Sequence, residues 1–180
     1  MKKNIILLVL VCLILFSCST SPQEYFGQAA LNCNMLYGFA GYELKRDLAT
    51  PAEKLVDEKT LATAPMKRAE VVQQKLEMVQ SNFKKVKGLS ATDDTKELLN
   101  ASTALYEYVL PVYKNEYHQL AALYDGGAAA DKIAAMEKSI NEKYEAKFLE
   151  LYNAVWVAGK AYATKNGIRV IDVNPSPASK

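Results

Sequence analysis

The longest helical pattern in the chain covers about residues 128–165, and it limits the possible folds more than any other feature. Apolar residues recur there every three or four positions, at Ile133, Met136, Ile140, Tyr144, Phe148, Leu151, Val155, Ala158 and Tyr162. This spacing places them on one face of an α-helix. Asn166-Gly167-Ile168 follows, and a glycine directly after a periodic segment is typical of a helix end. The segment therefore predicts one long amphipathic helix.

Three further segments show the same periodicity. In residues 23–48 the apolar face holds Phe26, Ala30, Cys33, Tyr37, Ala40, Leu44 and Leu48. In the segment that Thr63-Ala64-Pro65 opens, it holds Ala69, Val72, Leu76, Val79, Phe83 and Val86. In residues 93–124 it holds Leu98, Leu105, Tyr106, Val109, Tyr113, Tyr117, Leu120 and Tyr124. Long helices joined by short turns pack antiparallel, so the four patterns predict an all-α, up-down-up-down four-helix bundle domain over residues 24–168.

Local signals add detail to this plan. Thr50-Pro51-Ala52-Glu53 matches a capping box with proline at the first helical position, which predicts a short inserted helix up to about Ala62. Asp93 or Asp94 is expected to cap the third long helix. Pro111 is expected to kink that helix because proline removes one backbone hydrogen bond.

The first 17 residues, 1–17, follow the plan of a secretory signal peptide. Lys2 and Lys3 form a positively charged head, and residues 5–16 are an unbroken apolar run. At ~1.5 Å per residue, a helix of this length cannot cross a ~30 Å hydrocarbon core. A short apolar run with a small residue at its end, here Ser17, is instead typical of a peptide that is cleaved off.

The residues Leu15-Phe16-Ser17-Cys18 resemble the lipobox of bacterial lipoproteins. The resemblance implies cleavage before Cys18 and attachment of diacylglycerol and further acyl chains, such as palmitate, to that residue. Each buried CH₂ contributes about 0.8 kcal/mol to membrane attachment, so several chains anchor firmly. Residues 18–23 then form a lipidated polar tether. A plain signal peptide cut nearby, or an uncleaved anchor, is the alternative.

The residues after Cys18 bear on location. No aspartate follows it directly, and in lipoproteins an aspartate there acts as an inner-membrane retention signal. No acidic cluster follows either, although such clusters mark surface export in some bacterial groups. The resemblance therefore implies a cell-envelope protein anchored in the outer membrane and facing the periplasm, with the leaflet left open.

Charge and cysteine content narrow the function classes. Loss of residues 1–17 removes Lys2 and Lys3 and no acid, so the 22 basic and 20 acidic residues become 20 of each and the net charge is zero. A neutral chain with interspersed signs offers no basic stripe, so nucleic acid is not an expected partner. Cys33 remains as a single thiol on an apolar helix face, which favours a small buried residue over a redox centre.

The residues that would carry catalysis are missing from the sequence. The chain has one histidine, His118, and a di-iron site in a bundle needs paired Glu-x-x-His motifs. There is no Cys-x-x-Cys-His for covalent haem, no phosphate-binding loop and no Gly-x-Ser-x-Gly. We therefore predict no catalytic residue, no metal site and no cofactor, and expect a protein that is not an enzyme.

Four side chains are candidates for contact with a partner or a ligand. Tyr113 and Tyr117 lie near the middle of an apolar face, either as a core seam or as the lining of a groove opened by the proline kink. Glu116 lies at the edge of that face, where burial would raise its pKa unless it is hydrogen-bonded. Trp156 points away from its helix's apolar face. It therefore packs under the extended or flexible C-terminal tail, residues 169–180, or forms an exposed partner patch.

Two segments carry a second resemblance: Tyr113-Lys114-Asn115-Glu116-Tyr117 and the helix end Ala161-Tyr162-Ala163-Thr164-Lys165-Asn166-Gly167-Ile168. From Tyr106 to Ile168 the chain resembles an uncharacterised family of helical lipoproteins of diderm bacteria. The resemblance implies a membrane-tethered helical bundle whose role is unknown.

These observations predict a lipid-anchored binding or adaptor module that contacts the membrane through Cys18 and has an unidentified protein partner. Two alternatives stay open. One is a carrier of a small apolar ligand, which a co-purifying ligand would reveal. The other is an immunity or inhibitor lipoprotein that neutralises a periplasmic enzyme, which an adjacent toxin gene would favour.

Overall fold

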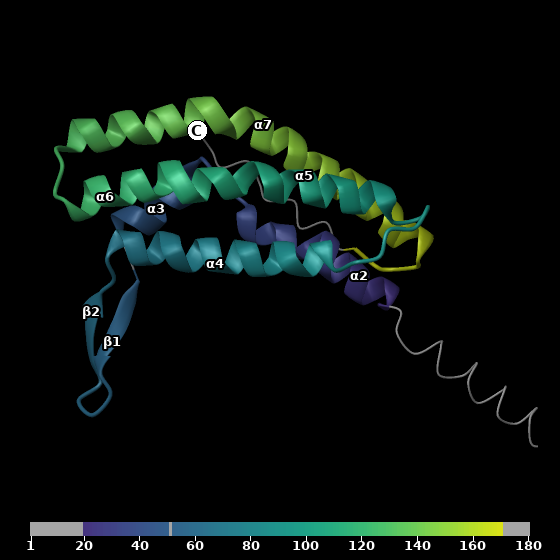
Figure 1. Cartoon of the computed structure of the whole chain (residues 1–180), viewed down its shortest axis with the longest axis horizontal. Coiled ribbons are helices and arrows are strands. Elements are labelled where there is room, and N and C mark those ends of the chain that lie inside the picture. Colours follow the sequence, from purple (N-terminus) through teal and green to yellow (C-terminus); the bar gives the residue numbers. More distant parts are fainter. Residues whose placement is uncertain (1–19, 51, 171–180) are drawn as a thin grey trace, which may run out of the picture.

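The computed structural model describes residues 20–50 and 52–170, and this part of the chain is mainly helical (Figure 1). The elements in chain order are α2 (Pro22–Ala29), η1 (Leu31–Leu36), α3 (Tyr42–Ala49), β1 (Glu53–Asp57), β2 (Ala62–Pro65), α4 (Arg68–Lys87), α5 (Lys96–Val112), η2 (Tyr113–Tyr117), α6 (His118–Asp125) and α7 (Ala130–Lys165). η1 is a 3₁₀-helix and η2 is a turn of π-helix. The predictions for residues 1–17 and for the lipid site at Cys18 lie outside the described residues.

Three long helical columns lie side by side and form most of the body: α4, the run α5-η2-α6, and α7 (Figure 1). The apolar faces predicted from periodicity are the ones these columns bury, as at Val72, Leu76, Val79, Val86, Leu98, Leu105, Val109, Leu120, Ile140, Phe148 and Val155. The three long helices predicted for this part of the chain are confirmed, and α7 alone has 36 residues. The start predicted for one of them, at Thr63-Ala64-Pro65, is wrong, because these residues belong to β2 and α4 begins at Arg68.

The single helix predicted for residues 23–48 is wrong, because the structure divides it into α2, η1 and α3. Gly38 and Ala40 have φ angles of 74° and 61°, a left-handed backbone that no α-helix contains. The N–H of Ala40 donates to the Tyr117 hydroxyl at 2.7 Å, and its carbonyl accepts from Asn141 Nδ2 at 3.1 Å. Since side chains of two long columns satisfy both groups, the break is a defined part of the fold.

The inserted helix predicted after Thr50 is also wrong, since residues 53–65 form an antiparallel β-hairpin from β1 and β2. Thr50 ends α3 instead of starting a helix. Proline follows Thr50 in the sequence, and the helical conformation is disfavoured for a residue that precedes proline. Leu55 lies opposite Thr63 in the register, with an irregularity directly after it. Figure 1 shows the hairpin standing away from the columns.

The turn of the hairpin lacks the glycine that usually marks one. Instead, Asp57 Oδ1 accepts hydrogen bonds from the N–H groups of Lys59, at 2.8 Å, and Thr60, at 3.3 Å. Leu61 then takes a φ angle of 55°, which is uncommon for a residue with a bulky side chain. This Asx-type turn holds the hairpin closed without a glycine.

The end of α6 and the start of α4 meet at one corner of the body. The carboxylate of Asp125, the last residue of α6, accepts hydrogen bonds from the N–H groups of Arg68 and Ala69 at 2.8 and 3.0 Å. These are orphan donors in the first turn of α4. Gly127 follows with a φ angle of 65° and turns the chain toward α7. The hairpin leads directly into α4, so Asp125 also fixes the point from which the hairpin projects.

The C-terminal end of α7 follows the sequence-based prediction. Gly167 has a φ angle of 65°, and the N–H of Ile168 donates to the carbonyl of Ala163 at 2.8 Å. Ile168 and Val170 pack half-buried against the core without forming a helix or strand. The remainder of the predicted tail lies outside the described residues. Among the helices of residues 20–50 and 52–170, none is long and apolar enough to cross a bilayer.

Candidate functional site

Tyr113 and Tyr117 lie inside the body, where their rings meet edge to face with centroids 4.8 Å apart. Phe39, from the segment between η1 and α3, packs against both of them at 5.6 and 5.4 Å and against Phe148 of α7 at 5.0 Å. The side chains of Tyr113 and Tyr117 are 5% and 0% exposed. A partner therefore reaches these two predicted contact residues only if the body opens.

The π-turn η2 brings these two tyrosines to the same side of their column. It follows directly after α5, whose penultimate residue is Pro111. α5 and α6 continue in nearly one direction across it in Figure 1, so the column is not opened into two arms at the proline. π-turns insert one extra residue per turn and are frequent at functional sites. Here the turn serves core packing, because it contributes buried aromatic rings.

Glu116 lies at the edge of the π-turn, and its side chain is 24% exposed. Its carboxylate accepts a hydrogen bond from the Tyr144 hydroxyl, and Lys143 Nζ lies 3.5 Å from it. Burial on its own raises the pKa of Glu116, but the Tyr144 hydrogen bond and the Lys143 charge outweigh it and leave the pKa below its usual value. Glu116 is therefore held as an anion that joins η2 to α7.

Trp156 is half-buried and is one of a row of aromatic side chains that ends at the surface with Tyr37. It contacts Tyr152 edge to face at 6.4 Å, and Tyr152 contacts the exposed ring of Tyr37 at 6.4 Å. The Tyr152 hydroxyl donates to Asn34 Oδ1 at 3.0 Å, which ties the row to η1. Tyr37 was expected on a buried face, and it turns outward because η1 ends just before it. Whether Trp156 also packs under the C-terminal tail depends on residues outside the described ranges.

The hairpin presents apolar side chains to solvent, and sequence reasoning missed it. Leu55, Val56 and Leu61 are 50, 56 and 72% exposed. Neither strand has a second neighbour among the described residues, so each leaves one edge without backbone partners. The β-branched and apolar residues around Leu55 were the available signal, but the turn carries none of the dipeptides that usually identify a hairpin.

A shallow groove of about 520 Å³ lies between the hairpin, α4 and α6. Apolar residues line part of it and polar residues the rest: Lys54, Met66, Ala69, Glu70, Gln73, Gln74, Glu77 and His118. Lys54 and Glu70 form an ion pair across it, and Gln73 Nε2 donates to Glu77 Oε1 at 2.7 Å. These polar groups already bond to one another, so the groove offers few free groups to orient a ligand.

Cys33 is buried, as predicted. Its thiol lies 3.6 Å from the carbonyl of Ala29 and 3.7 Å from the Ser102 hydroxyl. Burial raises the pKa of this thiol to about 11, so Cys33 stays protonated near neutral pH. Tyr106, nearby, is fully buried with a hydroxyl that has no hydrogen-bond partner. No base activates the thiol here, and we assign this cluster to packing.

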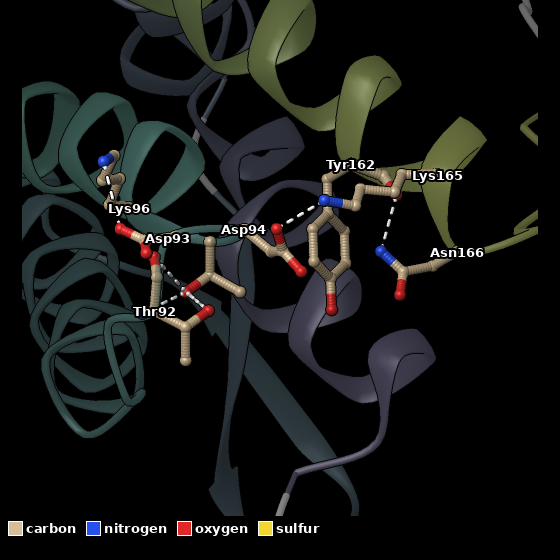
Figure 2. A network of polar contacts seen from close by, with 8 residues as sticks. Thr92, Asp93, Asp94, Lys96, Tyr162, Lys165 and Asn166 are labelled. Atoms are coloured by element: carbon tan, nitrogen blue, oxygen red, sulfur yellow. Dashed lines mark hydrogen bonds and ion pairs between the residues drawn. The ribbon is translucent and has the colours of Figure 1, made fainter.

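A polar network holds together one end of the helical body (Figure 2). We call this end the base; it consists of the first turn of α2, residues 84–96 and residues 162–170. Lys165 of α7 forms an ion pair with Asp94, and Lys96 pairs with Asp93 at 3.2 Å. The two aspartates thus bind lysines instead of capping α5, and Thr95 takes the N-cap position. The capping role predicted for them is wrong.

The base also receives the start of the described chain. The Tyr25 hydroxyl in α2 donates to the carbonyl of Ser90 at 3.2 Å, and the Tyr25 ring lies 5.5 Å from that of Tyr162. Residue 20 therefore enters the body at the base, whereas the hairpin projects from the other end of α4 (Figure 1). α4 has 20 residues, which at ~1.5 Å per residue separates the two ends by about 30 Å.

Comparisons with known proteins supply no relative. No protein-family model matches the chain, and no curated protein and no solved structure is significantly similar to it. Within residues 20–50 and 52–170, no group of three or more histidine, cysteine, aspartate or glutamate side chains is placed to hold a metal ion. The features that bear on function are therefore the geometry of the hairpin, the aromatic row and the base.

Proposed function

We propose that this chain is a lipid-anchored, non-enzymatic protein of the bacterial cell envelope that binds a protein partner through its β-hairpin. The observation that carries the proposal is the placement of the hairpin. It exposes Leu55, Val56 and Leu61 at one end of the body. Residue 20 lies at the opposite end, the base. An anchor at Cys18 would hold the base near the membrane and leave the hairpin free to meet a partner.

The chemistry of the hairpin suits an extended segment of a partner. Strand addition to an open edge supplies backbone hydrogen bonds, and alternate side chains then give specificity. A two-stranded hairpin is only marginally stable on its own, so a third strand would stabilise it. Trp156 and its aromatic row provide a second, smaller contact surface in this proposal.

For the architecture, we propose a variant of the up-down-up-down four-helix bundle. In this classification α4, α5 with α6, and α7 are three of its members, and the broken segment from α2 to α3 is the fourth. This arrangement supports an adaptor role because the described chain starts at one end of the bundle, the base, and the hairpin projects from the other end.

The test is a native pull-down of the lipidated full-length protein from membranes, with mass spectrometry of proteins and small molecules together. We expect a stoichiometric protein that is lost in Leu55→Ser/Leu61→Ser and that rebinds wild type after purification. Leu149→Ser is the matched control, because Leu149 is 54% exposed on α7, away from the hairpin. Retention of the same partner by the hairpin variant would contradict the proposal.

Other outcomes of this experiment select among the alternatives. A bound apolar molecule without a protein partner would favour a ligand carrier. A periplasmic enzyme as the captured partner, inhibited on binding, would favour an immunity protein. Loss of the partner in Trp156→Ala but not in the hairpin variant would move the contact site to the aromatic row.

A further inference from the structure

The base carries a cluster of lysines that the helical body does not use. Lys84, Lys85 and Lys87 lie in the last turn of α4, and all three are exposed. We call them the base lysines. Among the described residues no carboxylate forms an ion pair with any of them, and Lys87 contacts only the ring of Phe83, with Nζ 4.7 Å from its centroid.

The acids of the base do not neutralise this cluster. Asp93 and Asp94 are paired with Lys96 and Lys165, as Figure 2 shows. The remaining acids in the first turns of α2 and α5 are Glu24 and Glu97, whereas the base lysines are joined by the exposed Arg169. Positive charge is therefore in excess at this end, although the mature chain is neutral as a whole.

The proposed anchor would place the base, with its excess positive charge, close to the membrane surface. Four peptide steps separate Cys18 from Pro22, where α2 begins. An extended chain spans at most ~3.6 Å per residue, so an acylated Cys18 would hold the start of α2 within about 14 Å of the lipid surface. The base lysines lie at the same end of the body, which Tyr25 links to Ser90 just beyond α4.

We infer that Lys84, Lys85 and Lys87 contact anionic phospholipid head groups of the membrane that holds the chain, and so keep the hairpin directed away from it. This inference rests on the proposed lipid anchor and adds a charged contact to it. Basic residues near an anionic membrane surface are attracted to it over about a Debye length, ~8–10 Å at moderate salt. The short tether keeps the base close to that range.

The test uses the acylated full-length mature protein in nanodiscs of phosphatidylcholine, alone or mixed with phosphatidylglycerol. The readout is the acetylation rate of individual lysines, measured by mass spectrometry. We expect the base lysines to react severalfold more slowly in the anionic discs and to regain their rate at high salt. Lys132 and Lys138, exposed on the far half of α7, should react equally in both.

A second measurement follows orientation. A dye on Leu61→Cys, at the exposed hairpin tip, transfers energy to an acceptor in the lipid. Transfer should be weak in the parent protein and stronger when Lys84, Lys85 and Lys87 are all replaced by glutamine. The same replacement at Lys114, Lys132 and Lys138 should leave transfer unchanged. Equal circular dichroism of the two variants would show that both are folded.

The outcomes separate this inference from the proposal on which it rests. A protein that carries no acyl chain and leaves the membrane overturns both. An acylated protein whose base lysines react equally in the two kinds of disc overturns the lysine contact alone. Slowing of the same size in both kinds of disc would show proximity without recognition of anionic lipid, and would also overturn it.

Discussion

The hydroxyl of Tyr117 accepts a hydrogen bond from the backbone N–H of Ala40 at 2.7 Å, although the two residues are 77 positions apart in the sequence. Ala40 lies at the left-handed break between η1 and α3, where no helical partner is available for this N–H. Asn141 of α7 completes the arrangement by donating to the Ala40 carbonyl. The N-terminal segment is thus held in its broken form by two side chains from the long columns.

Removing this hydroxyl should destabilise the protein. In Tyr117→Phe the N–H of Ala40 stays buried without a partner, which costs about 1–3 kcal/mol of unfolding free energy. Urea titration followed by circular dichroism measures the loss. Tyr113→Phe is the control, because no group among the described residues hydrogen-bonds the Tyr113 hydroxyl. Equal stability losses in the two variants would show that the Tyr117–Ala40 bond does not hold the break.

Gly159 should tolerate no larger side chain, because α2 crosses α7 at this point. A Cβ there would lie 3.1 Å from Ala30 Cβ and 3.3 Å from Phe26 Cε2. Gly159→Val should therefore destabilise the fold by about 1–3 kcal/mol through overpacking. Gly27→Ala in α2 meets no atom within 4 Å and should stabilise it by about 0.5–1 kcal/mol, since glycine weakens a helix. Thermal unfolding of both variants tests the crossing, and a neutral Gly159→Val would argue against it.

The anionic state of Glu116 should appear in the pH dependence of stability. Burial raises the pKa of Glu116 in the folded protein, but the hydrogen bond from Tyr144 and the nearby charge of Lys143 lower it by more. The pKa therefore lies below the usual 4.5. A carboxyl whose pKa is lower in the folded state than in the unfolded state stabilises the fold at pH values above the unfolded-state pKa. This stabilisation is lost as the pH falls through the folded-state pKa. The stability advantage of wild type over Glu116→Gln should therefore be present at neutral pH and shrink below about pH 4.5. An advantage of the same size at neutral and at acidic pH would contradict this account of Glu116.

The thiol of Cys33 should report global unfolding. Burial raises its pKa from 9.0 to about 11, so the folded state favours the neutral thiol, and this stabilisation is lost as pH rises toward 11. At pH 8 we expect the folded protein with Cys12 and Cys18 both replaced by serine not to react with a thiol reagent, and the same protein unfolded in guanidinium to react. Cys33→Ser should abolish the reaction of the unfolded chain. Fast reaction of the native protein would show that the core opens at this position.

The helices that could be predicted from the sequence are those whose apolar residues recur at regular short intervals. α4 and α7 each carry an uninterrupted three-four apolar repeat, and their buried faces match it. The break at Ala40 depends on Tyr117 and Asn141, far along the chain, so no local pattern contains it. Gly38, with a positive φ angle, and Gly41, which directly precedes α3, were the local signs.

The candidate contact residues illustrate the same limit. Periodicity placed Tyr113 and Tyr117 correctly on an apolar face but could not tell a packed core from an open groove, and the structure buries both. Trp156 was identified because it departs from its helix's repeat, and Tyr152 contacts it from one turn earlier on α7. Tyr37 joins this row only through the folding of η1. The hairpin carried no turn signature, because Asp57 and Leu61 replace the expected glycine.

The most direct test of the central claim is the intact mass of the protein purified from membranes of a diderm bacterial host, together with its N-terminal peptide. The account predicts a chain that begins at Cys18, with diacylglycerol and a further acyl chain on that residue, and that moves into the detergent phase on partitioning. Cys18→Ser should remove both the added mass and the partitioning. A chain cleaved elsewhere, or one that begins at Cys18 without lipid, would contradict the account.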